Sequence, residues 1–527
     1  MSQNHYDVVI VGAGPAGIQL GYYLKKAGIN YVILEQGSSA GETFKMFPVH
    51  RKLISINKMF TGSNDPEFNM RHDWNSLLTD DYGIKFPTYD QKFFPDADNL
   101  VKYLADYVER YEINVKYNTQ VTTVDRVDEI YAVVDSDSNT YTSKNLVIAT
   151  GFKKPMVPKI PGIEYSVNYA NLDLETGKYE NKRVLILGKG NSGFETADHL
   201  VPYAALIHIA SPNPIKMAWK THYVGNLRAV NNNLLDTYQL KSQNAVLDAQ
   251  VLNIEKIANG QLDVTVRYGH AEGEVEVLRY DYVIACTGFK FDTSIFTETT
   301  MPALCYMDKF PAIMPSFESV NCPGMYFAGT ITHSLDYKKA TSGFIHGFRY
   351  NCRYLFNMLN EKIRGVHYPH QVLPKTAKLL TDLMLDRINR AAGLWQQAGF
   401  MTDVFVVNDG QLTHYKEMPQ PYVVNRFDAQ EYFTLNLEYG DPIEGDPFNV
   451  ERIHRTNTEQ AQRSQFLHPV VRHYFGKELL TRHDIIEDLE ANWVEPEHIN
   501  PLMQYLKSEL REVSVVPAKE LDLELTT

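Results

Sequence analysis

The length, composition and charge of the chain exclude several classes of protein. The chain has 527 residues, of which 44% are hydrophobic and 22% charged, a balance typical of a folded enzyme. Because so long a chain exceeds one hydrophobic core, we expect two or three domains. The formal net charge of -13 and the lack of a long Lys/Arg run argue against a nucleic-acid partner.

Cysteine usage and hydropathy favour a cytoplasmic protein. The four cysteines form no C-x-x-C pair, and a chain of this size does not depend on disulfides. No apolar run reaches the roughly 18–20 residues that a membrane span needs, so we expect no membrane span. The apolar strand that begins at Tyr6 leaves no room for a signal peptide, and the sequence Glu524–Thr527 matches no retention or peroxisomal address.

The first forty residues have the pattern of a strand, a glycine turn, a helix and a second strand. We predict strands at Asp7–Val11 and Tyr31–Leu34, with a helix over Ile18–Ala27 between them. Such a unit forms part of a parallel sheet. The turn fits the G-x-G-x-x-G fingerprint, whose glycines allow a tight turn, close approach of a pyrophosphate and close helix packing. The predicted cofactor-binding residues of this turn are Gly12, Gly14, Pro15, Ala16 and Gly17.

Glu35 closes the second strand of this unit. A carboxylate at that position accepts hydrogen bonds from ribose hydroxyls. A pyrophosphate site followed by a ribose-binding acid predicts a dinucleotide, and we expect FAD here.

The same pattern returns later in the chain. We predict a strand at Arg183–Leu187, a helix that ends near Leu200 and a strand at Leu206–Ala210. No acid ends that last strand, and three cations follow it, which favours the 2′-phosphate of NADPH over NADH. The cations are Lys216, Lys220 and Arg228, and the predicted cofactor-binding residues of the second turn are Gly188, Gly190, Asn191, Ser192 and Gly193.

Two similar strand exits separate these units. Val147–Gly151 and Val283–Gly288 each run from an apolar strand into a turn that ends in Thr-Gly, and Met325–Thr330 is a later strand of the same type. The predicted fold class is α/β, with a first Rossmann-like domain over 1–155 and 289–363 and a second, over 156–288, inserted in it. Residues 364–527, richer in aromatic and acidic residues, are expected to form a C-terminal α+β module. The predicted cofactor-binding residues at the junctions are Thr150, Gly151, Gly288, Gly329 and Thr330.

These motifs resemble those of two-dinucleotide-binding-domain flavoproteins, and among them the flavin-dependent monooxygenases. Gly41–Phe44 lies where those enzymes have G-G-x-W, and Arg51–Lys58 lies where they place residues against the isoalloxazine. Glu67–Leu77, Thr221–Gly225 and Gly343–Arg349 are similar to segments of endoplasmic-reticulum flavoproteins associated with degradation. The resemblance covers most of the chain and implies FAD in the first unit and NAD(P)H in the second. It also implies cofactor contacts for Gly41, Phe44, Arg51, Asn57, Val121, Gly343 and Phe344.

Four positions depart from the pattern of these monooxygenases. Ile160–Ser166 keeps the glycine of their F-x-G-x-x-x-H motif but has Ile for Phe and Ser for His. Leu53 stands where Baeyer–Villiger enzymes have Asp, and Thr330 replaces an acid that usually follows the late glycine. The changes in this motif and at Leu53 weigh against ketone oxidation.

The resemblance predicts a monooxygenase that uses NADPH, FAD and O2 to oxygenate a small-molecule substrate through a flavin C4a-hydroperoxide. N-oxygenation, S-oxygenation and Baeyer–Villiger oxidation stay open, as does homo-oligomerisation. Asn57, Arg51 and His333 are the predicted catalytic residues, and the scattered histidines predict no metal site. The alternatives are a flavin-dependent dithiol reductase, which would need a redox cysteine pair, and a flavoprotein scaffold without catalysis.

Overall fold

The first unit is built on a parallel five-stranded sheet. The computed structural model describes residues 4–241, 244–441, 445–446 and 449–511. The three central strands of the sheet are mostly Val, Ile and Leu and are buried along their whole length, as a parallel sheet between helices requires. In sheet order they are β20 (Met325–Phe327), β8 (Asn145–Ile148), β2 (Val8–Val11), β3 (Tyr31–Leu34) and β4 (Val115–Lys116).

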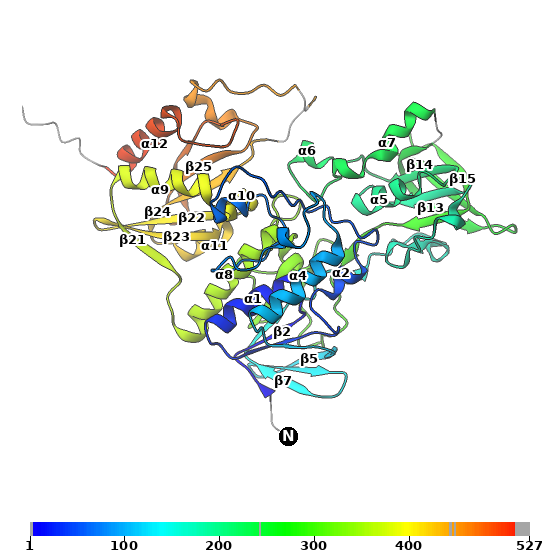
Figure 1. The fold of residues 1–527 in the computed structure, drawn as a ribbon, viewed down its shortest axis with the longest axis horizontal. Coiled ribbons are helices and arrows are strands. Elements are labelled where there is room, and N and C mark those ends of the chain that lie inside the picture. Colours follow the sequence, from blue (N-terminus) through cyan, green and yellow to red (C-terminus); the bar gives the residue numbers. More distant parts are fainter. Residues whose placement is uncertain (1–3, 242–243, 442–444, 447–448, 512–527) are drawn as a thin grey trace, which may run out of the picture.

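Three long helices and a second sheet accompany this first sheet. Helix α1 (Pro15–Lys26) packs on α8 (Ile345–Arg364), and α4 (Ala97–Arg110) lies in the same unit (Figure 1). Helix α1 begins three residues before the predicted start, because Pro15 is well suited to the first turn and Gly14 is the N-cap. The second sheet contains β1 (Asn4–His5), β7 (Thr140–Ser143), β6 (Ile130–Asp135) and β5 (Val121–Val127).

The second unit is a seven-stranded mixed sheet that is inserted into the first unit. The parallel part of the sheet carries helix α5 (Asn191–Leu200), and its last two pairings are antiparallel. The chain then returns to the first sheet, where β20 pairs with β8, so the predicted insertion is confirmed. The strands are β10 (Val167–Asn168), β16 (Tyr282–Ala285), β11 (Arg183–Leu187), β12 (Leu206–Ser211), β13 (Ala245–Lys256), β14 (Leu262–Tyr268) and β15 (Val275–Tyr280).

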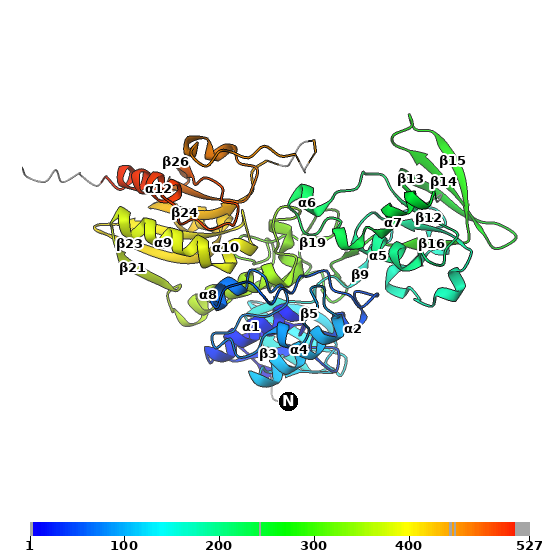
Figure 2. The ribbon, with the colours of Figure 1, turned by 45° about the horizontal axis from the view of Figure 1, so that its top comes forward.

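The C-terminal module is an antiparallel six-stranded sheet with helices, and it lies on the opposite side of the first unit from the second unit (Figures 1 and 2). Its main helices are α9 (Ala377–Arg390) and α12 (Pro496–Glu509), which pack on each other. In sheet order the strands are β21 (His370–Pro374), β23 (Gln411–Pro419), β22 (Met401–Asn408), β24 (Glu431–Glu438), β25 (His468–Phe475) and β26 (Glu478–Asp484). Shorter helices elsewhere are α2 (Glu42–Met46), α3 (Pro66–Asn69), α6 (Ala218–Thr221), α7 (Asn233–Asp236), α10 (Ala392–Gln396) and α11 (Gln420–Arg426).

A buried arginine joins this module to the first unit. Arg387 on α9 donates to Asp403 at 2.6 Å and to Glu417 at 3.0 Å, and its side chain is only 4% exposed. It also donates to Glu67 of α3 at 3.0 Å. Because removing one partner of a buried ion pair leaves the other charge uncompensated, this arginine is costly to replace.

We therefore expect Arg387→Met to lower the free energy of unfolding by about 3–5 kcal/mol, because buried Asp403 loses its arginine partner and Glu417 keeps only Arg353 among the described residues. The matched control is Lys378→Met, which breaks an exposed ion pair with Asp382 on the same helix and should cost under about 0.5 kcal/mol. Denaturant titrations of both variants measure the difference. Equal losses would show that the buried network does not hold the module.

Candidate functional site

One cavity of about 530 Å³ collects most of the predicted cofactor-binding residues. Its wall contains the residues that directly follow the strands β2, β3, β8 and β20. These are the carboxyl ends of parallel strands, where open α/β sheets bind their ligands. The predicted residues on the wall are Gly12, Gly14, Pro15, Ala16, Glu35, Gly41, Phe44, Val121, Thr150, Gly151, Asn191, Ser192, Gly329, Thr330, Gly343 and Phe344.

The first glycine turn has two kinds of glycine. A Cβ on Gly12 would lie 2.7 Å from the Ala149 carbonyl oxygen, and one on Gly17 would lie 2.0 Å from the Gly12 oxygen. Both glycines therefore serve the packing of the turn itself, and Gly17 does not line the cavity. A Cβ on Gly14 would meet nothing within 4 Å. Since Gly14 is also the N-cap of α1, this open space lies at the positive end of a helix, where a phosphate is favoured.

Glu35 stands beside this turn. Its carboxylate accepts hydrogen bonds from the Ala13 amide at 2.7 Å and from the Gly37 amide at 2.8 Å. These bonds fix the carboxylate on the cavity wall at the end of β3. That position suits a ribose hydroxyl, as the sequence predicts.

The second glycine turn repeats the arrangement. A Cβ on Gly188 would lie 2.3 Å from the Cys286 oxygen and one on Gly193 would lie 2.2 Å from the Gly188 oxygen, whereas Gly190 again has free space around it. Asn191 and Ser192, at the start of α5, reach the cavity wall. Gly188, Gly190, Gly193 and Gly288 do not line the cavity.

The three cations predicted near a 2′-phosphate do not gather. Arg228 lies on the cavity wall, where it donates to the Ile54 oxygen at 3.0 Å, and Lys220 donates to the Gly445 oxygen at 3.4 Å. The sequence of β12 itself ends without an acid, but the neighbouring strand β13 places Asp248 beside Ser211, the last residue of β12. Asp248 forms an ion pair with Lys189 of the glycine turn. The preference for NADPH over NADH therefore loses most of its support from this segment.

The three predicted catalytic residues lie outside the cavity wall. Asn57 is 2% exposed, and its amide donates to the Asp90 oxygen at 2.5 Å and the Lys92 oxygen at 3.3 Å. It ties two loops together, which explains why its side chain is turned away from the cavity. Neither a catalytic nor a cofactor-binding role for Asn57 is supported by this position.

Arg51 and His333 contact residues that line the cavity but do not line it themselves. Arg51 donates to the Phe44 oxygen at 2.6 Å and pairs with Asp98, so it holds the segment that carries Phe44. The His333 ring is buried against Phe344, and burial lowers its pKa to about 4. Both residues position cavity-lining groups and do not line the cavity themselves.

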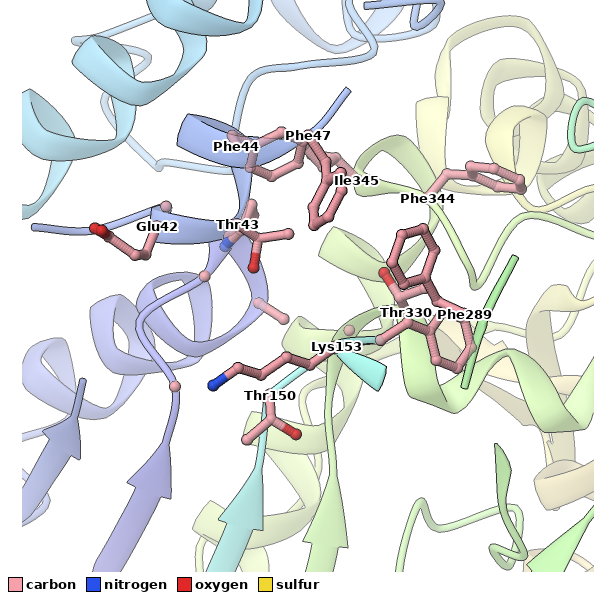
Figure 3. A pocket seen from close by; sticks show the side chains of 18 of the residues that line it. Glu42, Thr43, Phe44, Phe47, Thr150, Lys153, Phe289, Thr330, Phe344 and Ile345 are labelled. Carbon is pink, nitrogen blue, oxygen red and sulfur yellow. The ribbon is translucent and has the colours of Figure 1, made fainter. Parts of the chain in front are cut away.

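Aromatic side chains surround the part of the cavity between the two units (Figure 3). Figure 3 shows Phe44 beside Phe47, with Phe289 and Phe344 on another side and Thr150 at the end of its strand. Phe47 contacts both Phe289 and Tyr169, with ring centroids 5.0 and 6.2 Å apart. This apolar wall excludes water from the space between the two fingerprint turns.

Several polar or aromatic residues of the wall were not predicted as cofactor-binding or catalytic residues, among them Glu195, Tyr169, His346 and Trp74. Glu195 follows Ser192 by one helical turn, and its carboxylate accepts from the Tyr169 hydroxyl at 3.2 Å. Burial raises the pKa of Glu195 to about 7. His346 stacks on Trp74, with ring centroids 4.2 Å apart. Glu195 had a local signal, its place in the fingerprint helix, and His346 had one in its place beside the predicted flavin segment at Gly343 and Phe344.

Comparisons with known proteins agree with this geometry. The model of the pyridine nucleotide-disulphide oxidoreductase family matches residues 9–329. FAD-dependent oxidoreductase domain-containing protein 2 of Mus musculus is 35% identical, over 96% of this chain and 84% of its own. Probable indole-3-pyruvate monooxygenase YUCCA4 of Arabidopsis thaliana is 25% identical, over 56% of this chain and 80% of its own.

A solved structure gives the same fold. The flavin-containing monooxygenase from Stenotrophomonas maltophilia superposes with a TM-score of 0.52 at 20% identity and covers 68% of this chain and 99% of its own. In the described part of the chain, no helix is both long and apolar enough to cross a membrane. The family match, the full-length relative and the paired glycine turns agree, and the chain belongs to the pyridine nucleotide-disulphide oxidoreductase family of FAD-dependent oxidoreductases.

Proposed function

We propose that this protein is an NAD(P)H-dependent flavin monooxygenase that transfers one oxygen atom of O2 to a small-molecule substrate. The observation that carries the proposal is the shared cavity, because its wall includes both the first glycine turn and the residues Asn191 and Ser192 of the second. A nicotinamide can reduce a flavin only where the two rings meet, and a common cavity provides such a place.

The residues present fit FAD. The free space at Gly14 accepts a pyrophosphate at the start of α1, and Glu35 is fixed where a ribose hydroxyl would donate a hydrogen bond to its carboxylate. When bound there, FAD would supply the electron transfer from nicotinamide to O2. The chain itself orients the cofactor and excludes water through Phe44, Phe47 and Phe289.

The cysteines weigh against the rival dithiol reductase. None of the four, all of which the structure describes, lines the cavity. Burial raises the pKa of Cys286 to about 12, so its thiol is protonated at neutral pH. Since the thiolate is the reactive form, this group is not a redox centre of the required kind. Relatives named as monooxygenases favour oxygen chemistry over a scaffold without catalysis.

The reaction with oxygen tests the proposal. The protein is reduced with NADPH without air and mixed rapidly with oxygenated buffer in the presence of NADP⁺. A monooxygenase should show a transient absorbance that differs from both reduced and oxidised flavin and persists for seconds or longer. Direct return to oxidised flavin, with hydrogen peroxide released in equal amount to the NADPH used, would contradict the proposal.

Substitutions at Gly14 and Gly190, the two glycines with free space around them, test the two nucleotide sites one at a time. Because neither side chain position meets protein atoms within 4 Å, Gly14→Val and Gly190→Val should leave the fold intact and block only the ligand. We expect Gly14→Val to be isolated without FAD. We expect Gly190→Val to keep FAD but to lose its reduction by NADPH. The flavin released on denaturation and anaerobic reduction rates measure the two effects.

Gly17→Val is the control for this comparison. Its side chain would collide with the Gly12 backbone, so this variant should lose stability as well as FAD. If Gly190→Val loses FAD while Gly14→Val keeps it, the assignment of the two turns is reversed.

The pH dependence of NADPH binding tests the role of Glu195. With a pKa of about 7, this carboxyl is mainly neutral below pH 7 and negative above it. A negative charge on the wall repels the phosphates of the nucleotide, so the Kd for NADPH should rise as pH increases through about 7, at most about tenfold per pH unit. Glu195→Gln should flatten this profile. Identical profiles for the two proteins would remove Glu195 from the nucleotide site.

A further inference from the structure

A guanidinium group without a carboxylate partner lies on the wall of the main cavity. We propose that Arg228, together with His346 and Trp74, binds the carboxylate of an organic acid with an aromatic body. That such an acid is the substrate rests on the proposed function, whereas the binding site itself does not.

Arg228 has unused hydrogen-bonding capacity. Its guanidinium makes one hydrogen bond, to the Ile54 oxygen at 3.0 Å, and pairs with no Asp or Glu of the described ranges. Burial lowers its pKa, which shows that the charge has lost part of its hydration. An arginine stays charged under these conditions, so an anion that accepts its remaining N–H groups compensates the lost water.

His346 adds a second donor at the same place. It is 2% exposed, and neither ring nitrogen has a hydrogen-bond partner among the described residues. Burial and the neighbouring Arg349 and Arg228 lower its pKa well below the usual range, so the ring is neutral and carries one N–H. His346 is also in the first turn of α8, whose positive end favours an anion. Two donors and a helix terminus thus lie close to one another.

Aromatic rings complete the site. The centroids of the Trp74 and His346 rings lie 4.2 Å apart. The Cζ atom of Arg228 lies 5.4 Å from the centroid of the Trp74 ring. Phe344 stacks on His346 with an interplanar angle of 11°. Flat apolar surface beside an anion site matches a planar hydrocarbon body that carries a carboxylate.

A phosphate of the nicotinamide nucleotide is the second source of such an anion. The Arg228 backbone amide donates to the Asn191 side chain at 2.9 Å, which places Arg228 next to the second glycine turn. The carboxylate is favoured because the contacts of the guanidinium itself are with Trp74 and Ile54 of the first unit, whereas Asn191 accepts its hydrogen bond from the Arg228 backbone. An experiment therefore has to measure both ligands.

Calorimetric titrations of the purified full-length protein test the site. Phenylacetate and its neutral amide, phenylacetamide, are the probes, and NADPH is titrated separately. We expect wild-type protein to bind the acid at least about tenfold more tightly than the amide, as expected for hydrogen bonds to a charged group. Arg228→Met should remove this preference without changing the Kd for NADPH. Lys216→Met, an exposed cation of the same segment outside the cavity wall, should behave like wild type.

His346→Phe provides a second variant if Arg228→Met does not fold. It keeps the stacking on Trp74 but removes the N–H, so it should weaken binding of the acid and leave NADPH binding unchanged. No preference for the acid in wild type, an unchanged preference in both variants, or a loss confined to NADPH would overturn the inference. Because these titrations need neither turnover nor oxygen, they can succeed even if the oxygen reaction fails, so the two proposals are separable.

Discussion

The site depends on a short antiparallel pairing where the chain crosses between its two Rossmann units. β9 (Lys154–Pro155) pairs with β17 (Phe289–Lys290), and the Met156 amide donates to the Gly288 oxygen at 2.9 Å between them. Each crossing leaves directly from the carboxyl end of a buried strand. The pairing joins the two chain crossings, and the cavity wall takes the strand ends of the first sheet together with Asn191, Ser192 and Glu195 of α5 in the second unit.

The backbone of the site could be predicted from sequence because its constraints are local. A Cβ on Gly17 would meet the Gly12 oxygen of the same turn, and the sequence shows that requirement at a fixed spacing. The Ala149 oxygen that a Cβ on Gly12 would meet lies far along the chain, at the end of the neighbouring strand. Side chains on the wall follow no such rule. Trp74 and Arg228 meet only because two units pack together, and nothing near either residue in sequence indicates it. The position of the Asn57 side chain could not be predicted for the same reason, since its hydrogen-bond partner Asp90 lies on another loop.

The chain as a whole is negatively charged, whereas the positive ends of two helices face the cavity. The protein has a formal net charge of -13, yet FAD and NAD(P)H both carry negative phosphates. Attraction of these cofactors therefore has to be local, and the starts of α1 and α5 provide it. Glu195 lies beside α5, but its raised pKa means that desolvation keeps much of it neutral near pH 7. Burial thus removes a charge that would oppose the nucleotide.

The C-terminal module, which had no interpretable motif, is connected to the cavity through the loop that carries Trp74. Arg349 of α8 donates to the backbone oxygens of Met70, Asp73 and Ser76, all within 3 Å. From the module, Gln396 donates to the Arg71 oxygen at 2.5 Å, and Arg71 donates to the Ile388 oxygen at 2.6 Å.

The bonds from Arg349 and Gln396 go to backbone oxygens of the loop and so fix its course, whereas the bond to Ile388 comes from the loop's own Arg71 side chain. The loop is therefore held from two sides, by α8 of the first unit and by α9 and α10 of the module. A change in the seating of the module would move the Trp74 ring, and with it the stacking on His346, without altering either glycine turn. The module therefore helps to fix the position of the Trp74 ring on the cavity wall, and under the proposed function it would bear on which molecule the cavity accepts.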